Sequence, residues 1–128
     1  MFLIHKMDTT LTRGIEYIPM AKEGDGKVGM LLIPSGDHYA SPNATDLPTH
    51  LAVGKANEAA LNHAVRLDSQ IELEVITEAD LTDKALGAKL QINSDTGDTV
   101  TADPDGRAQL TYKEKCEDGK WICRVRFI

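Results

Sequence analysis

Hydrophobic and acidic residues alternate at 71–77 more clearly than anywhere else in the chain. Ile71, Leu73 and Val75 are separated by Glu72 and Glu74. Successive side chains of a strand point to opposite faces of a sheet, so this period of two predicts a strand with one buried and one solvated face.

Further short strands are predicted after this segment, at 89–93, 99–101, 109–112 and 121–127. Turn sequences rich in Asp and Gly separate them, at 94–98, 103–106 and 117–119. In the last strand Trp121, Cys123, Val125 and Phe127 share one face, which we expect to fill the core. Segment 78–87 is expected to connect two strands and to be a possible boundary between two parts of the domain. This spacing favours a mainly β fold, a small β-barrel or β-sandwich of short antiparallel strands.

The middle of the chain continues this pattern with one exception. Segment 27–33 is almost wholly apolar and bounded by Gly26 and Pro34, which predicts a buried strand. A turn at 34–37, a strand at 38–40, a loop at 41–46 and a strand at 48–54 follow. The exception is 55–65, where four alanines and the i, i+4 pair Leu61 and Val65 predict a short helix or an ordered loop.

Residues 1–26 show little periodicity and are predicted to form an extended N-terminal arm before a single β-rich domain at 27–128. Within the arm, 15–18 has strand propensity, and Pro19 favours an edge position because proline lacks a backbone donor. A strand at an edge can pair with another protein. The predicted interaction residues are therefore Phe2, Leu3, Ile4, Ile15, Tyr17 and Ile18.

Composition narrows the possible partners. The chain has 128 residues, which suits one domain, and only two Phe, three Tyr and one Trp, so a thin core is expected. The net charge of −6 opposes binding to nucleic acid. No stretch approaches the roughly 20 apolar residues of a membrane span, and His5 and Lys6 interrupt 2–4 before a secretory signal could form. We expect synthesis in the cytoplasm and no membrane partner.

The two cysteines flank the turn sequence at 117–119. A two-residue loop at Asp118 and Gly119 would pair Cys116 with Trp121, so the cysteines would not face one another. A disulfide needs a longer, less favoured loop. Two reduced thiols are therefore predicted, with the disulfide left as the alternative.

No motif for catalysis, metal binding or cofactor binding is complete in this sequence. The sequence at 24–27 lacks the first glycine and the hydroxyl residue of a phosphate loop, and Ser35 lacks a nucleophile elbow. Asn93, Asp95, Asp98, Asp103 and Asp105 do not match an EF-hand, and Asx turns explain them, with an incidental cation as the alternative. We predict no enzyme activity, no cofactor and no metal site.

Histidines and charged pairs are expected at the surface. His5, His38, His50 and His63 have no metal-ligand spacing, so each is predicted in a turn or on the surface. Glu72 with Glu74, Lys113 with Lys115, and Arg124 with Arg126 each share a strand face. A solvated face is the expected role of each pair.

The order of several segments resembles that of small head decoration proteins of tailed bacteriophages and prophages. The segments are Glu16-Tyr17-Ile18-Pro19, Lys27-Val28-Gly29-Met30-Leu31, the Ser35-Gly36 turn, Pro48-Thr49-His50-Leu51 and Ala64-Val65-Arg66-Leu67. The resemblance covers about 16–75, and the closing Arg124-Val125-Arg126-Phe127 is similar to the end of such proteins.

This resemblance implies a capsid decoration, or cement, protein. Such a protein binds the outer surface of the assembled head, often as a trimer, and stabilises contacts between major capsid subunits. The expected partners are the phage major capsid protein and further copies of this chain. The alternatives are another phage structural component, such as a head fibre base or tail protein, and a small ligand-binding β-domain.

Overall fold

The computed structural model describes residues 1–6, 15–21, 27–55, 61–103 and 105–128, and all regular elements among them are strands. The strands are β1 (Leu3–Lys6), β2 (Glu16–Pro19), β3 (Leu31–Ser35), β4 (His38–Ala40), β5 (His50–Lys55), β6 (Leu61–Arg66), β7 (Glu72–Thr77), β8 (Lys89–Ile92), β9 (Val100–Ala102), β10 (Ala108–Lys115) and β11 (Trp121–Phe127). The predicted mainly β fold is confirmed.

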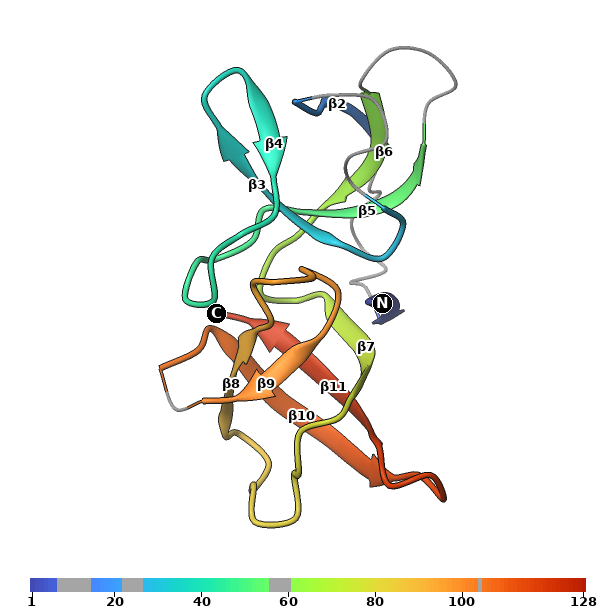
Figure 1. Cartoon of the computed structure of the whole chain (residues 1–128), viewed down its shortest axis with the longest axis vertical. Helices are drawn as coiled ribbons and strands as arrows, with labels where there is room; N and C mark the ends of the chain where they lie inside the picture. Colours follow the sequence, from blue (N-terminus) through green and yellow to red (C-terminus); the bar gives the residue numbers. More distant parts are fainter. Residues whose placement is uncertain (7–14, 22–26, 56–60, 104) are drawn as a thin grey trace.

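The strands form two antiparallel sheets. One has six strands in the order β1-β7-β11-β10-β8-β9, and the other has five in the order β2-β6-β5-β3-β4. The five-stranded sheet occupies the upper half of Figure 1, and β7 to β11 occupy the lower half. The first two strands of the chain are therefore separated, one in each sheet, and each lies at a sheet edge.

The main hydrophobic core is formed by the six-stranded sheet and one face of β3 and β5. Leu73 and Val75 of β7 point into it, as do the four residues predicted to share a face of β11. Leu31 and Leu51 join this core from the other sheet, and the β7–β8 connection adds Leu81. Because both sheets contribute to one core, they form one folding unit.

The five-stranded sheet curls into what we call the small barrel. A parallel bridge joins Met20, directly after β2, to Tyr39 of β4, so the two outermost strands approach each other. A second core lies inside, formed by Ile18, Met20, Leu32, Ala52 and Ala64, with Tyr39 packed against it. Neighbouring residues of β3 and β5 therefore serve different cores, which explains the uninterrupted apolar run of β3.

Several strand predictions are confirmed, whereas the short helix or ordered loop predicted at 55–65 is wrong for the described residues of that segment. The strands at 71–77, 89–93, 99–101, 109–112 and 121–127 correspond to β7 to β11, with small shifts of their ends. In the predicted helix at 55–65, Lys55 ends β5 and 61–65 lie in β6, while 56–60 lie outside the described residues. Pairing with β2 and β5 on either side outweighs the local helix propensity of the alanines.

The described parts of 1–26 are strands of the domain rather than a separate arm, so the predicted boundary at residue 26 is wrong for them. Leu3 pairs with Glu74 of β7, and Tyr17 pairs with His63 of β6. Phe2 is almost fully buried in the main core, with its ring 6.1 Å from that of Phe127. The strand propensity predicted at 15–18 and its edge position are confirmed by β2, whereas the four residues of β1 are too few to show a period.

The terminal hairpin differs from prediction by one residue of register. Cys116 N donates to Lys120 O, so the loop has three residues, with Gly119 at φ +87°. Trp121 consequently pairs with Lys115 and Cys123 with Lys113. A three-residue loop ending in a left-handed glycine is a standard hairpin turn. Both thiols are free, as predicted, with Cys123 buried and Cys116 half-buried.

Candidate functional site

The six predicted interaction residues divide between the interior and the surface. Phe2 and Ile18 are buried in the two cores, and Ile4 packs partly against the main core. Leu3, Ile15 and Tyr17 have exposed fractions of 50%, 59% and 67%. Alternation along β1 and β2 explains the division, because every second side chain points outward. Only the outward-pointing residues are available to a partner in this fold.

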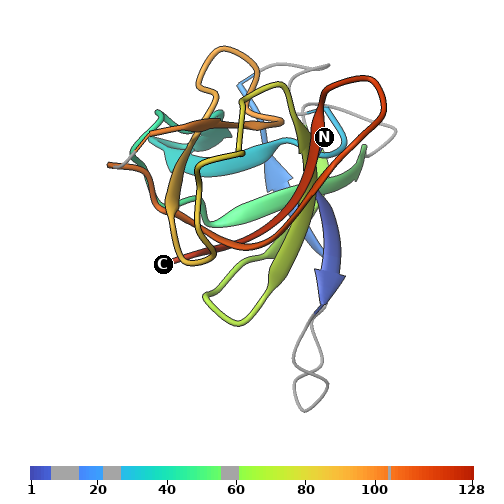
Figure 2. The same cartoon turned by 90° about the horizontal axis from the view of Figure 1, so that it is seen from below.

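An apolar surface, which we call the edge patch, lies beside β1. It consists of Met1, Leu3, Ile76 and Ile122, which line a hollow of about 250 Å³ together with Glu74 and Val75. Ile76 of β7 and Ile122 of β11 are directly paired across the sheet, and Ile76 is 54% exposed. Within the described residues β1 has a strand partner on one side only, and it lies at the margin of the fold (Figures 1 and 2). Apolar side chains and an open strand edge thus occur together.

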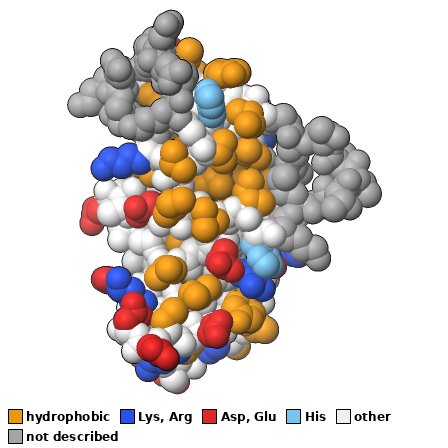
Figure 3. All heavy atoms as spheres, turned by 90° about the vertical axis from the view of Figure 1, so that its right-hand side faces the viewer, with side chains coloured by type: hydrophobic (Ala, Val, Ile, Leu, Met, Phe, Trp, Pro, Cys, Tyr) orange, Lys and Arg blue, Asp and Glu red, His pale blue; other side chains and the backbone are white. Residues whose placement is uncertain are grey.

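Paired charges border the edge patch on the same face of the six-stranded sheet. Arg124 Nε donates to Glu74 Oε2 over 3.0 Å, and the Arg124 guanidinium lies 4.3 Å from the ring centre of Tyr112. Arg126 Nη2 is 3.9 Å from Glu72 Oε2. The side of the molecule on the right of Figure 1 faces the viewer in Figure 3, where hydrophobic side chains gather in the middle and charged side chains lie mainly below them and to their left. An apolar centre with a polar rim is the usual arrangement of a protein interface.

A larger hollow of about 510 Å³ lies between β7 and β9, next to Met1. Two hydroxyl groups of its lining are already used within the fold. Thr77 Oγ1 donates to Val100 O over 2.6 Å, and Thr99 Oγ1 donates to Ile76 O over 2.7 Å. These bonds connect the two strands, so the hydroxyls do not converge on a ligand.

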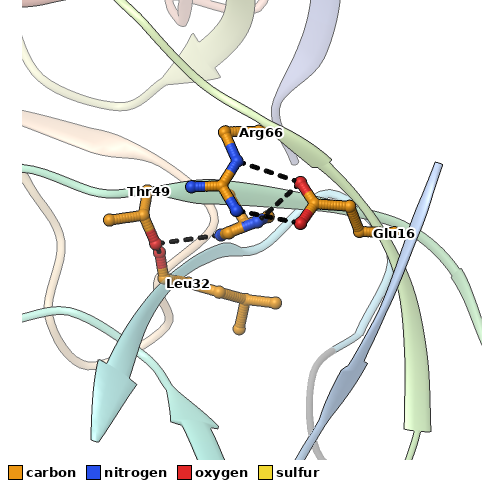
Figure 4. Close-up of polar contacts among 5 residues, drawn as sticks. Glu16, Leu32, Thr49 and Arg66 are labelled. Atoms are coloured by element: carbon orange, nitrogen blue, oxygen red, sulfur yellow. Dashed lines mark hydrogen bonds and ion pairs between the residues drawn. The ribbon is translucent and has the colours of Figure 1, made fainter. Parts of the chain in front are cut away.

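A polar cluster in the small barrel has His50 at its centre. His50 is fully buried, and its Nε2 lies 3.1 Å from Glu16 Oε2. Its Nδ1 lies 3.0 Å from Thr49 Oγ1, and its ring centre lies 5.0 Å from that of Tyr39, with the two ring planes nearly perpendicular. Arg66 holds both oxygens of Glu16, with distances of 3.2 Å from Nε and 2.9 Å from Nη2 (Figure 4). The cluster fastens β2 to β5 and β6.

Two pKa values in this cluster are lowered, that of Glu16 by hydrogen bonding and that of His50 by burial. The hydrogen bonds from Arg66 lower the pKa of Glu16 below its ordinary value, with a smaller contribution from His50. Burial lowers the pKa of His50, and the neighbouring Glu16 opposes that effect only in part. At neutral pH the cluster therefore contains a carboxylate, a guanidinium and a neutral imidazole.

Thr49, His50 and Glu16 have the residue types of a hydroxyl–imidazole–carboxylate triad, but the arrangement does not suit catalysis. His50 has no exposed surface, so a substrate cannot reach its ring. Glu16 is held by Arg66 in addition to His50, and Thr49 Oγ1 is also 3.3 Å from Leu32 O. A catalytic hydroxyl must be presented to a substrate beside donors for the developing oxyanion. The cluster is structural.

His50 is buried within β5, which overturns its predicted position in a turn or on the surface. His50 begins β5, whose next residues, Leu51 and Ala52, are buried toward opposite cores. A strand buried on both faces has no polar–apolar alternation, so the pattern does not show which way His50 points. Its partner Glu16 is 34 residues away in sequence. No sequence signal was available to link the two.

The Asp- and Asn-rich turns are Asx turns, as predicted. Asn93 Oδ1 accepts from Asp95 N, and Asp103 Oδ1 accepts from Asp105 N. Among the described residues no group of three His, Cys, Asp or Glu side chains is placed to hold a metal ion. Nor does this part of the chain contain a helix with the length and apolarity of a membrane span.

Searches with protein-family models, among curated proteins and among solved structures found no match to this chain.

Proposed function

We propose that this protein is a bacteriophage capsid decoration protein, which binds the outside of the assembled head and stabilises contacts between major capsid subunits. The edge patch beside the open edge of β1 carries the proposal from the structure. The order of segments over 16–75, which resembles that of head decoration proteins, supplies its context. A purely mechanical role requires no catalytic group, cofactor or metal.

The edge patch suits a partner that presents an extended apolar segment. An open strand edge offers unpaired backbone donors and acceptors, and a further strand can satisfy them. Leu3 at the edge, with Ile76 and Ile122 behind it, would take apolar side chains of that strand. The proposed partner is the major capsid protein. Further copies of this chain, as a homotrimer, complete the proposed assembly on the virion surface.

Co-sedimentation with undecorated heads of the same phage tests the proposal through one substitution. Ile76→Asp places a charge in the centre of the edge patch and is expected to weaken head binding at least tenfold. Leu86→Asp makes a comparable change at a 64% exposed residue of the β7–β8 connection and should leave binding unchanged. Circular dichroism and thermal melting check that both variants stay folded.

Two outcomes would contradict the proposal at different levels. Absence of saturable binding by the wild-type protein would reject the decoration role and favour a tail component or a ligand-binding β-domain. Wild-type binding with equal affinity for both variants would reject the edge patch as the capsid-facing surface. Light scattering on the protein alone tests the trimer separately, because a monomer mass would place trimerisation after docking or exclude it.

A further inference from the structure

Both ring nitrogens of the fully buried His50 have a hydrogen-bonding partner. A carboxylate only accepts hydrogen bonds, so Nε2, which faces Glu16, must carry a hydrogen. In the neutral ring Nδ1 is then an acceptor, and the Thr49 hydroxyl donates to it. In the charged ring Nδ1 becomes a donor and requires the Thr49 oxygen as its acceptor.

The Thr49 hydroxyl has a second acceptor within reach. Thr49 Oγ1 is 3.3 Å from Leu32 O, and Thr49 N donates to the same carbonyl over 2.9 Å. A carbonyl oxygen has two lone pairs, so Leu32 O can accept from both groups. Rotation of the hydroxyl would move its hydrogen from His50 Nδ1 to Leu32 O without displacing a heavy atom.

We propose that Thr49 is a hydroxyl switch that keeps His50 hydrogen-bonded inside the small barrel in both of its protonation states. With the neutral ring, the chain runs from Thr49 O–H to Nδ1 and from Nε2–H to Glu16. With the charged ring, Nε2–H still donates to Glu16, Nδ1–H donates to Thr49 Oγ1, and Thr49 O–H donates to Leu32 O. The attachment of β2 to the barrel through Glu16 survives the change.

Among the groups around His50, only Thr49 is placed to exchange hydrogen-bonding roles with Nδ1. Glu16 of β2 favours the charged ring, and Arg66 of β6 opposes it. Tyr39 of β4 meets the ring edge-on. None of these groups faces Nδ1 as an acceptor, whereas Thr49 does.

The sign of one pKa change tests the switch. The substitution Thr49→Val removes the hydroxyl at nearly constant volume. If the hydroxyl rotates, the charged ring loses more than the neutral ring, because hydrogen bonds from charged groups are stronger, and the pKa of His50 falls. If the hydroxyl only donates to Nδ1, its removal relieves a clash of two donors in the charged ring and the pKa rises. Thr49→Ser retains the hydroxyl and should restore the wild-type pKa.

Nuclear magnetic resonance of ring nitrogens and carbons supplies the measurement. His50→Gln identifies the His50 signals among the four histidines. At about pH 7.5 the neutral ring is expected as the Nε2–H tautomer. The proposal would be overturned if the pKa of His50 in Thr49→Val were unchanged or raised, or if the wild-type ring were the Nδ1–H tautomer.

If the protein unfolds on acidification before His50 is protonated, measurements of stability against pH test the switch instead. A folded-state pKa below the unfolded value contributes stability that is present above about pH 6.5 and is lost as the pH falls. Thr49→Val should therefore lose more free energy of unfolding than wild type between about pH 7.5 and 5.5, and Thr49→Ser should not. An equal or smaller loss in Thr49→Val contradicts the switch, and the other histidines cancel in the comparison.

Discussion

A methyl group has no room at Gly106, where the loop before β10 crosses β8. A Cβ built on this residue would lie 1.9 Å from Leu90 O and 2.5 Å from Gln91 N, both of them backbone atoms. Backbone atoms of a sheet cannot move aside as the end of a side chain can. Gly36 makes the opposite demand, because a Cβ there meets nothing within 4 Å while its φ is +67°. The two glycines separate steric from conformational effects.

Alanine substitutions at these two glycines are expected to differ in cost. Gly106→Ala should lower the free energy of unfolding by about 2–3 kcal/mol, because β8 and the loop must separate. Gly36→Ala should cost about 1 kcal/mol, from the left-handed backbone alone. Urea denaturation of both variants measures the difference, and equal costs would argue against the close approach at Gly106.

At the scale of the element, β1 and the residue directly before it contribute both to the hydrophobic core and to the molecular surface. Phe2 fills the main core, whereas Leu3 points to the surface and contributes to the edge patch. Phe2 N also donates to Gly29 O over 2.9 Å, which links the start of the chain to the segment before β3. Removing residues 1–19 would therefore remove core as well as interaction surface.

Substitutions at Phe2 and Leu3 should separate these roles. Phe2→Ala is expected to lower the free energy of unfolding by about 3–5 kcal/mol, as for other buried aromatic residues. Leu3→Ala should change it by about 0.5 kcal/mol or less, because half of that side chain is already exposed. Denaturant melts of the two variants provide the comparison. Comparable losses would mean that β1 does not sit in the sheet as described.

For the whole molecule, the shared core predicts that both sheets unfold together. Cys123 lies in this core with Leu31 and Leu51 of the other sheet. Burial raises the pKa of its thiol to about 12, so almost no thiolate is present at neutral pH. Because the thiolate is the reactive form, a thiol reagent should reach Cys123 only when the core opens.

Thiol labelling in Cys116→Ser, which leaves Cys123 as the one thiol, tests this cooperativity. The free energy of opening derived from the labelling rate should equal the free energy of global unfolding measured by urea. A markedly smaller opening free energy would show that the two sheets separate without global unfolding. The same measurement on Phe2→Ala should show both quantities falling together.

Sequence patterns predicted β7 and β11 well because each strand has one face in the core and the other toward the surface. The period of two at 71–77 and the four residues sharing a face of β11 follow from that geometry, and the described burial agrees. The Asx turns were also predictable, since each is formed by residues adjacent in sequence. The free state of the two cysteines was predicted correctly although the hairpin register was not.

Predictions failed where distant segments determine the local structure. The alanine-rich segment has helix propensity, but 61–65 pair with β2 and β5 on either side. Of the six predicted interaction residues only Leu3, Ile15 and Tyr17 are exposed, because β1 and β2 are strands of the two sheets. The edge patch itself joins residues from the first, seventh and eleventh strands, so no local window contains it.

The sequence by itself determined the β class, the firmest strands and the local turns, because these depend on the period of side chains and on backbone preferences of neighbouring residues. Only the tertiary structure decided that β1 and β2 belong to the domain, that His50 is buried and that Glu16 is its partner. Such contacts depend on which strands lie side by side. Which strands pair depends on the burial of apolar surface over the whole chain, so it cannot be predicted from short segments alone.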